Sequence, residues 1–151
     1  MGGFVPDTSC MVAAVCAWHE HHSRAATEIN RRLTLKEPML LAAPALVEAY
    51  AVLTRLPPPH RLSATDALAL LDASFISAGK TVALDAASYR SLLRQAATDG
   101  IAGGRMYDAV IARCALKAKA SALLTFNAQH FLSLATAELE IIVPGPSSLS
   151  S

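Results

Sequence analysis

The sequence predicts an α/β domain in which a largely parallel five-stranded sheet lies between helices on both of its faces. Five short apolar runs alternate with segments of helical periodicity, and this alternation is typical of parallel sheets. The runs are almost continuously apolar, as expected of strands buried on both faces. With 151 residues, 53% hydrophobic and 17% charged, the chain has the size and composition of one compact domain.

The first half of the chain is expected to supply two strands and three helices. In order they are a strand at 4–7, a helix reaching residue 18, a polar helix at 20–33, a strand at 39–43 and a helix at 45–55. Thr8 and Ser9 are suitable caps for the first helix, whose apolar stripe ends at Trp18 and is expected to be core or dimer surface. Pro44 suits the first position of the last of these helices.

The second half is expected to continue the alternation. Its predicted elements are a helix at 63–76, a strand at 81–85, a helix at 86–98, a helix after Gly103 and Gly104, a strand at 122–125, a short helix at 128–135 and a strand at 140–143. Ser63 with Asp66 resembles a capping box, and Gly100 fits a helix C-cap. No repeat or linker divides residues 1–151, so we expect a single domain, with 144–151 as a disordered tail.

Charge and cysteine content limit the classes of function. The net charge of +1 gives no strong field toward nucleic acid or membrane, and basic side chains such as Arg31 and Arg32 are expected to be solvated. The three cysteines lack metal-binding spacing, which favours a reducing cytoplasm. No apolar run approaches the roughly 20 residues needed to cross a bilayer, and MGGFVPD does not have the features of a signal peptide.

Acidic side chains recur at equivalent places in successive units. Asp7 ends the first strand, Glu48 and Asp108 lie early in helices, and Asn127 follows the strand at 122–125. The carboxyl ends of parallel strands share one edge, where ligands bind at a switch in strand order. These four side chains can therefore meet, although their spacing alone does not prove it.

Three carboxylates and one carboxamide would form a site made only of oxygen ligands. Such ligands suit Mg²⁺ or Mn²⁺ rather than zinc or copper, and a divalent ion of this kind is suited to hydrolysing phosphodiesters. Simpler roles remain open. Asp7 and Asp108 could be helix caps, Glu48 could pair with Arg55, and Asn127 could be a turn residue.

Four motifs, taken in order, resemble those of PIN-domain ribonucleases, and most closely the VapC toxins of bacterial toxin–antitoxin modules. They are VPDTS with Asp7, PALVEAYAVLTR with Glu48, GGRMYDAVIARCAL with Asp108, and LLTFNAQHF with Asn127. The resemblance implies a PIN-like three-layer fold and a metal-dependent endoribonuclease that cuts structured RNA such as tRNA or rRNA. It also implies a homodimer neutralised by a VapB-type antitoxin.

Carried over to this chain, the resemblance makes Asp7, Glu48 and Asp108 the metal ligands and catalytic residues. Asn127 stands where many members have a fourth acid, so it is expected to be a weak ligand. The expected RNA contacts are two basic residues of the third motif, Arg105 and Arg113.

Parts of the sequence are compatible with other functions. Asn127 favours a PIN-like module that binds RNA or protein without cutting it. A phosphatase that uses Asp7 as nucleophile would want a second Asp where Ser9 stands, and flap-type DNA nucleases are longer and more acidic. The histidines at 19, 21 and 22 are expected to be exposed surface, and Thr125 an ordinary strand residue.

Overall fold

The computed structural model describes residues 2–145 and contains five parallel strands in the order β3-β2-β1-β4-β5. The strands are β1 (Phe4–Pro6), β2 (Leu40–Ala42), β3 (Lys80–Val82), β4 (Ala122–Leu124) and β5 (Glu140–Ile142). One ladder pairs β1 with β4 and β4 with β5, and the other pairs β2 with β3. A parallel bridge between Phe4 and Met39 joins the two. The predicted parallel sheet of five strands is confirmed.

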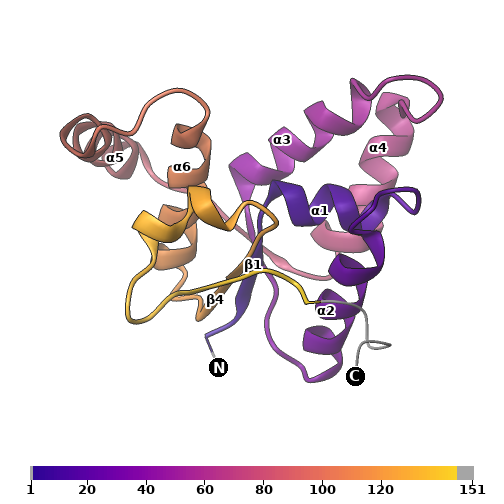
Figure 1. The fold of residues 1–151 in the computed structure, drawn as a ribbon, viewed down its shortest axis with the longest axis horizontal. Helices are drawn as coiled ribbons and strands as arrows, with labels where there is room; N and C mark the ends of the chain where they lie inside the picture. The colour runs from indigo at the N-terminus through magenta and orange to yellow at the C-terminus, as the bar shows by residue number, and fades with distance from the viewer. Residues whose placement is uncertain (1, 146–151) are drawn as a thin grey trace.

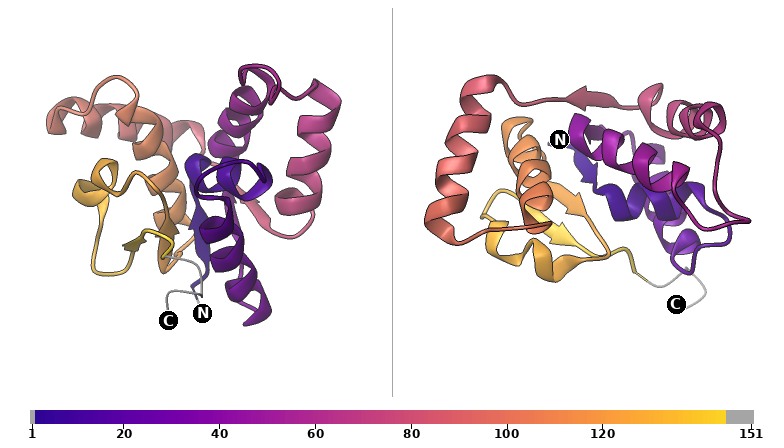
Figure 2. Two further views of the ribbon diagram at one scale, coloured as in Figure 1. Left: turned by 45° about the vertical axis from the view of Figure 1, so that its right-hand side comes forward. Right: turned by 90° about the horizontal axis from the view of Figure 1, so that it is seen from above.

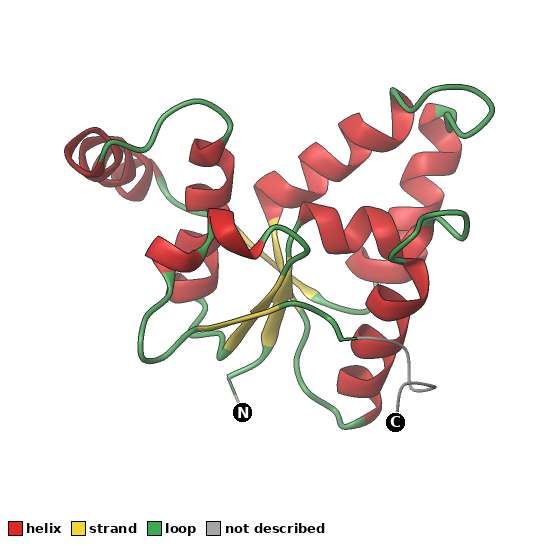
Figure 3. Ribbon diagram, viewed as in Figure 1, coloured by secondary structure: helices red, strands yellow, loops and turns green. Residues whose placement is uncertain are grey.

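Helices cover both faces of this sheet, as the sequence predicts. They are α1 (Thr8–Val15), α2 (His22–Thr34), α3 (Ala43–Thr54), α4 (Ala64–Leu71), α5 (Ala86–Asp99) and α6 (Arg105–Lys117). Figure 1 shows α1 to α4 on the right of β1 and β4, with α5 and α6 on the left, and the turned views of Figure 2 keep the two groups apart. Strands lie between the helical layers in Figure 3. The arrangement has three layers.

Several predicted boundaries differ from the structure. Helix α1 ends at Val15, so Trp18 lies in the following turn and is 49% exposed. Of the two expected places for Trp18, the core is therefore wrong, while the dimer surface stays a prediction. The N-cap of α1 is Asp7 rather than Thr8 or Ser9. Strand β3 ends at Val82. The segment expected to be one short helix forms two 3-10 turns, Ala128–His130 and Leu132–Leu134, while a π-helical turn at Asp72–Ile76 continues α4.

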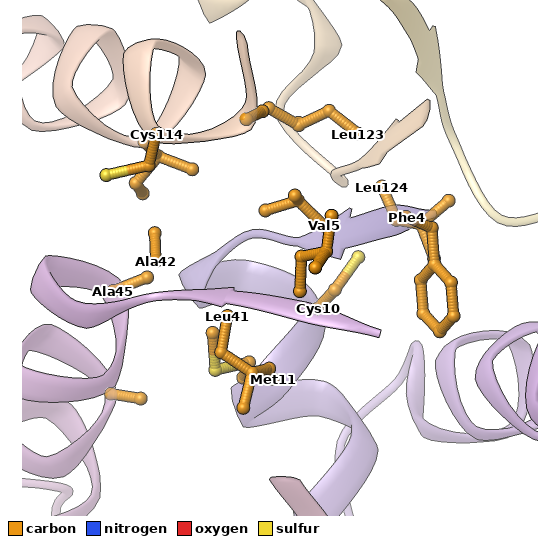
Figure 4. Close-up of a cluster of buried hydrophobic side chains, with 14 of the residues drawn as sticks. Phe4, Val5, Cys10, Met11, Leu41, Ala42, Ala45, Cys114, Leu123 and Leu124 are labelled. Carbon is orange, nitrogen blue, oxygen red and sulfur yellow. The ribbon is translucent and has the colours of Figure 1, made fainter. Parts of the chain in front are cut away.

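The core is built around the central strand β1. Phe4 and Val5 are buried there together with Leu41 of β2, Leu123 of β4 and Met11 of α1 (Figure 4). All three cysteines are buried and free, as expected for a reduced protein. Because both faces of β1 are covered, the strand is rigidly held, and so is the residue that follows it, Asp7.

A buried ion network ties α2 to the loop before β2, which corrects the expectation that Arg32 is solvated. Arg32 is only 9% exposed. Its guanidinium bonds Glu28 at 2.7 Å and Glu37 at 2.8 Å, and it lies 5.6 Å from the centre of the Phe4 ring. Burial alone would raise the pKa of Glu28, but the hydrogen bonds from Arg31 and Arg32 bring it below its ordinary value.

Part of the expected disordered tail lies within the described residues. The carbonyl oxygen of Pro144 accepts hydrogen bonds from Arg24 at 2.6 and 3.0 Å, so the first residue of that segment is tied to α2. The remainder, 146–151, lies outside the described residues. None of the helices in residues 2–145 is long and apolar enough to span a bilayer.

Candidate active site

A pocket of about 420 Å³ opens at the carboxyl ends of β1 and β4. Strand β1 has β2 on one side and β4 on the other, so this is where the strand order reverses and where ligands bind in open parallel sheets. The lining residues come from α1, the turn after it, α3, α6 and the segment after β4: Asp7, Thr8, Ser9, Val12, His19, Glu20, His21, Glu48, Val52, Asp108, Phe126 and Asn127. All four of the oxygen-bearing residues expected from the sequence therefore meet in one pocket.

Asp7 is both a helix cap and a pocket residue. Its Oδ1 accepts hydrogen bonds from the Cys10 N–H at 2.9 Å and from the Ser9 hydroxyl at 2.6 Å, as an N-cap does. Burial raises the pKa of Asp7, and the negative charge of Asp108 adds to the rise. Hydrogen bonds from Ser9, Thr125 and Cys10 only partly offset it. The role of cap and the role of metal ligand are thus compatible, because one carboxylate carries two oxygens.

Glu48 is held by the residue next to Asp7. The Thr8 hydroxyl donates a hydrogen bond to Glu48 Oε1 at 2.5 Å, which connects the start of α1 with α3. The alternative partner, Arg55, forms no ion pair with Glu48 within residues 2–145, although both side chains line the neighbouring groove between α3, α5 and α6. This role of Thr8 could not be predicted from the sequence, since a threonine beside a helix cap is common.

Asp108 lies in the first turn of α6 and faces the pocket. Its Oδ2 is 3.1 Å from His130 Nδ1, and its side chain is 19% exposed. Burial raises the pKa of Asp108. The charge of His130 opposes the rise and that of Glu48 adds to it. Asp108 therefore repels both of the other carboxylates, those of Glu48 and Asp7.

The segment after β4 is fixed to the start of α1 by small polar side chains. Asn127 donates its N–H to the hydroxyl of Thr125 at 2.8 Å, and the Phe126 N–H donates to the Ser9 hydroxyl at 3.1 Å. Thr125 is not an ordinary strand residue, because it lies just beyond β4, fully buried, and hydrogen-bonds both Asn127 and Asp7. Through these bonds Ser9 and Thr125 set the place of Asn127 relative to Asp7.

Neither arginine expected to contact RNA lines this pocket. Arg105 begins α6, and its charge acts to lower the pKa of Asp108 without reversing the net rise. Arg113 lies two turns further along α6, in a hollow shared with Leu92 and Gln95 of α5. Arg105 therefore acts on Asp108 among the three acids, and Arg113 lies apart from them. Contact of either arginine with RNA stays a prediction.

The donor set fits a hard divalent cation. Asp7, Glu48 and Asp108 offer carboxylate oxygens and Asn127 a carboxamide oxygen, which are the ligands that Mg²⁺ and Mn²⁺ prefer. Within residues 2–145, however, no three acidic, histidine or cysteine side chains lie close enough together to hold a metal ion in their present positions, so the carboxylates would have to move closer together to bind one. A bound cation would attract the carboxylates and so offset their repulsion of one another.

Comparison with known proteins agrees with this fold and pocket. Residues 4–136 match the sequence model of the PIN domain. Ribonuclease VapC40 of Mycobacterium tuberculosis is 43% identical over 120 residues, which are 80% of this chain and 83% of that protein. Ribonuclease VapC27 of the same organism is 35% identical over 108 residues, covering 72% and 66% of the two chains. The chain therefore belongs to the PIN-domain family and, within it, to the VapC ribonucleases.

Solved structures share the fold at low sequence identity. VapC20 of Mycobacterium tuberculosis, described as a Sarcin-Ricin loop cleaving toxin, aligns with a TM-score of 0.67 at 16% identity over 87% of this chain and 95% of that chain. VapBC2 of Rickettsia felis, bound to a DNA fragment from its promoter, aligns with a TM-score of 0.66 at 17% identity over 93% and 97%. VapBC of Salmonella typhimurium, also bound to DNA, aligns with a TM-score of 0.65 at 18% identity over 96% and 100%.

Proposed function

We propose that this protein is a metal-dependent endoribonuclease toxin that cleaves structured RNA, tRNA or rRNA, and thereby arrests translation. The observation that carries the proposal is the convergence of Asp7, Glu48 and Asp108 in one pocket of a chain that is 43% identical to a ribonuclease. The similarity to a toxin that cleaves the Sarcin-Ricin loop supports structured RNA as the substrate class.

The three acids would hold Mg²⁺ or Mn²⁺, with Asn127 as a weaker ligand. When bound, such an ion activates water and neutralises the charge that develops on the attacked phosphate. The chain's own residues position these ligands. Thr8 holds Glu48 and His130 holds Asp108. Because these two carboxylates are already oriented, they lose less conformational freedom when metal and substrate bind. Arg105 is close enough to the acids to attract the phosphate backbone.

The proposed partners are a VapB-type antitoxin and a second copy of the chain. The similarity to three complexes, two of them named VapBC and the third FitAB, supports an antitoxin partner. A groove of about 550 Å³ between α3, α5 and α6 supports the homodimer, because Val47, Tyr89 and Tyr107 are exposed along it. Sedimentation of wild type and of Val47→Arg tests this arrangement. We expect wild type to be a dimer and Val47→Arg to be a monomer.

The activity is tested by incubating purified protein with bacterial tRNA and rRNA in Mg²⁺, Mn²⁺ or chelator. We expect defined cleavage products with either metal and none with chelator. Asp108→Asn should remove cleavage while keeping the melting temperature, because the amide still fills the pocket. Asp66→Asn, on the exposed start of α4, is the matched control and should cleave normally. Full cleavage by Asp108→Asn would overturn the proposed site.

The alternative is a PIN-like module that binds RNA or a protein without cutting it. It is favoured by Asn127, which leaves the pocket one acid short, and by the hydrogen bonds that already engage Glu48 and Asp108. The same experiment separates the two proposals. Binding of tRNA or rRNA without any cleavage in Mn²⁺ would favour the module.

A further inference from the structure

A pair of stacked aromatic rings lies beside His19, which lines the pocket. Trp18, in the turn after α1, stacks on His60, in the loop between α3 and α4, with ring centres 4.0 Å apart and planes 20° from parallel. Both side chains are exposed, and 49% of the surface of Trp18 remains open to solvent despite the stack. Two loops that are distant in sequence thus meet to present aromatic surface to solvent rather than to the core.

A second pair lies inside the pocket. His21 stacks on Phe126 with centres 4.4 Å apart and planes 14° from parallel, and the guanidinium of Arg24 lies 5.4 Å from the centre of the Phe126 ring. His19 connects the pairs, since its ring is 5.9 Å from Trp18 and 5.6 Å from His21. We refer to the five rings together as the aromatic row: Trp18, His19, His21, His60 and Phe126.

The aromatic row leads directly to the carboxylates. The Phe126 N–H donates to the Ser9 hydroxyl, which in turn donates to Asp7. His19, His21 and Phe126 line the same pocket as Asp7, Glu48 and Asp108. A ligand whose phosphate lies at the carboxylates would therefore place its neighbouring groups along the row.

The chemistry of the row selects the kind of group. Flat aromatic faces stack on nucleobases, and every base offers such a face, whereas bases in a duplex are already stacked on each other. The imidazoles add hydrogen-bonding groups, and the guanidinium of Arg24 adds positive charge. Glu20, 3.3 Å from His21, is the acid next to them in the pocket lining. An unpaired base beside the cleaved phosphate fits both the flat shape of these rings and their position next to the carboxylates.

We propose that the aromatic row is a binding site for unpaired RNA bases that flank the cleaved phosphate, with Trp18 as its principal stacking surface. This inference rests on the proposed function, because it requires the phosphate to lie at the carboxylates. It also implies a preference for RNA whose bases are unpaired at the cleaved position, as in loops and bulges.

The test uses Trp18 as its own reporter, because it is the one tryptophan in the chain. Wild-type protein in chelator is titrated with ten-nucleotide poly(A) or poly(U), with an RNA duplex of equal length, and with an abasic oligonucleotide of equal length. We expect the single strands to quench the fluorescence of Trp18, and the duplex and abasic strands to leave it nearly unchanged. Chelator keeps this measurement independent of cleavage.

Variants extend the test to affinity, measured by the anisotropy of labelled single-stranded RNA. Trp18→Ala should weaken binding by roughly 5- to 100-fold, the range for loss of one stacked base, while Trp18→Phe should stay close to wild type. Leu93→Ala, which removes an exposed apolar side chain from α5, is the matched control and should bind normally.

The outcomes distinguish this inference from the proposed function. Quenching by single strands in a protein that cuts no RNA would keep the aromatic row and reject the nuclease. The inference is overturned if duplex and abasic strands quench as strongly as single strands. It is equally overturned if Trp18→Ala binds and cleaves RNA like wild type.

Discussion

The hydroxyl of Thr8 donates to the carboxylate of Glu48 at 2.5 Å, so the residue after Asp7 fixes the second acid of the pocket. This bond joins the start of α1 to α3, two segments that are 40 residues apart. It accounts for how a glutamate on a partly exposed helix is held toward the other acids. Thr8 is therefore a positioning residue, which acts through Glu48.

Replacing Thr8 tests that relationship. Thr8→Val has nearly the same shape but no hydroxyl, so Glu48 loses its donor and we expect RNA cleavage to fall by roughly tenfold or more, as for a lost hydrogen bond to a charged group. Thr8→Ser keeps the donor and should restore most of the rate. The measurement is the cleavage rate of each variant at several Mn²⁺ concentrations. Equal rates for the valine and serine variants would assign Thr8 a packing role.

Two aspartates cap helices in the same way but differ in burial, and this difference predicts opposite effects on stability. Asp7 accepts from the Cys10 N–H within the core, and burial raises its pKa above the ordinary 3.8. Asp85 accepts from the Ser88 N–H at the exposed start of α5, and hydrogen bonds to Ser88 lower its pKa below 3.8.

The sign of each effect follows from proton linkage. The folded protein binds the Asp7 proton more tightly than the unfolded chain does, so wild type loses stability as the pH rises above 3.8. Asp7→Asn removes this loss and should raise the melting temperature at pH 7 in chelator.

Asp85 contributes stability above pH 3.8 that disappears as the pH falls through its folded pKa. Asp85→Asn should therefore lower the melting temperature at pH 7. Thermal melts from pH 3 to 8 check both, and a fall for Asp7→Asn would mean that its cap outweighs its desolvation.

The buried network around Arg32 should dominate the stability of α2. Arg32→Met leaves the carboxylates of Glu28 and Glu37 without their shared partner, and we expect unfolding free energy to fall by about 3 kcal/mol or more. Arg31→Met is the control, since the Arg31 side chain is 54% exposed and its pair with Glu28 should contribute less than about 1 kcal/mol. Urea unfolding measures both, and equal losses would contradict the assignment.

Asn127 determines how much negative charge the pocket carries. Asn127→Asp adds a fourth carboxylate to the lining, so it should tighten metal binding and lower the Mn²⁺ concentration needed for cleavage. In chelator the same change should lower the melting temperature through repulsion, and added Mn²⁺ should restore it. Parallel metal titrations of the rate and melting temperature measure these effects. Superimposable curves would make Asn127 a turn residue only.

The parallel sheet and the meeting of Asp7, Glu48, Asp108 and Asn127 could be predicted because both depend on local pattern. Apolar runs of strand length specify the sheet, and the carboxyl ends of its strands specify where the acids lie. The supporting residues were not predictable in that way. Their polar contacts join segments far apart in the chain. Examples are the contacts of Thr8 with Glu48, of His130 with Asp108 and of Phe126 with Ser9.

The aromatic row shows why periodicity failed at Trp18. Its spacing from Val15 continues the apolar stripe, but α1 ends at Val15 and the chain turns, which directs the ring to His60 instead of the core. The same turn brings His19 and His21 to the pocket, although adjacent histidines suggested exposed surface. Helix ends depend on tertiary contacts, so a boundary error of three residues is enough to leave Trp18 exposed beside His19 rather than in the core.

The central claim is that the carboxylates of the pocket hold a divalent cation, and calorimetric titration of Mn²⁺ into metal-free protein tests it most directly. Wild type should bind the ion, while Glu48→Gln and Asp108→Asn should each weaken binding at least tenfold, because each removes a charged ligand. Asp66→Asn, on the exposed first turn of α4, should bind as wild type does. Identical titration curves for wild type, Glu48→Gln and Asp108→Asn would contradict the claim.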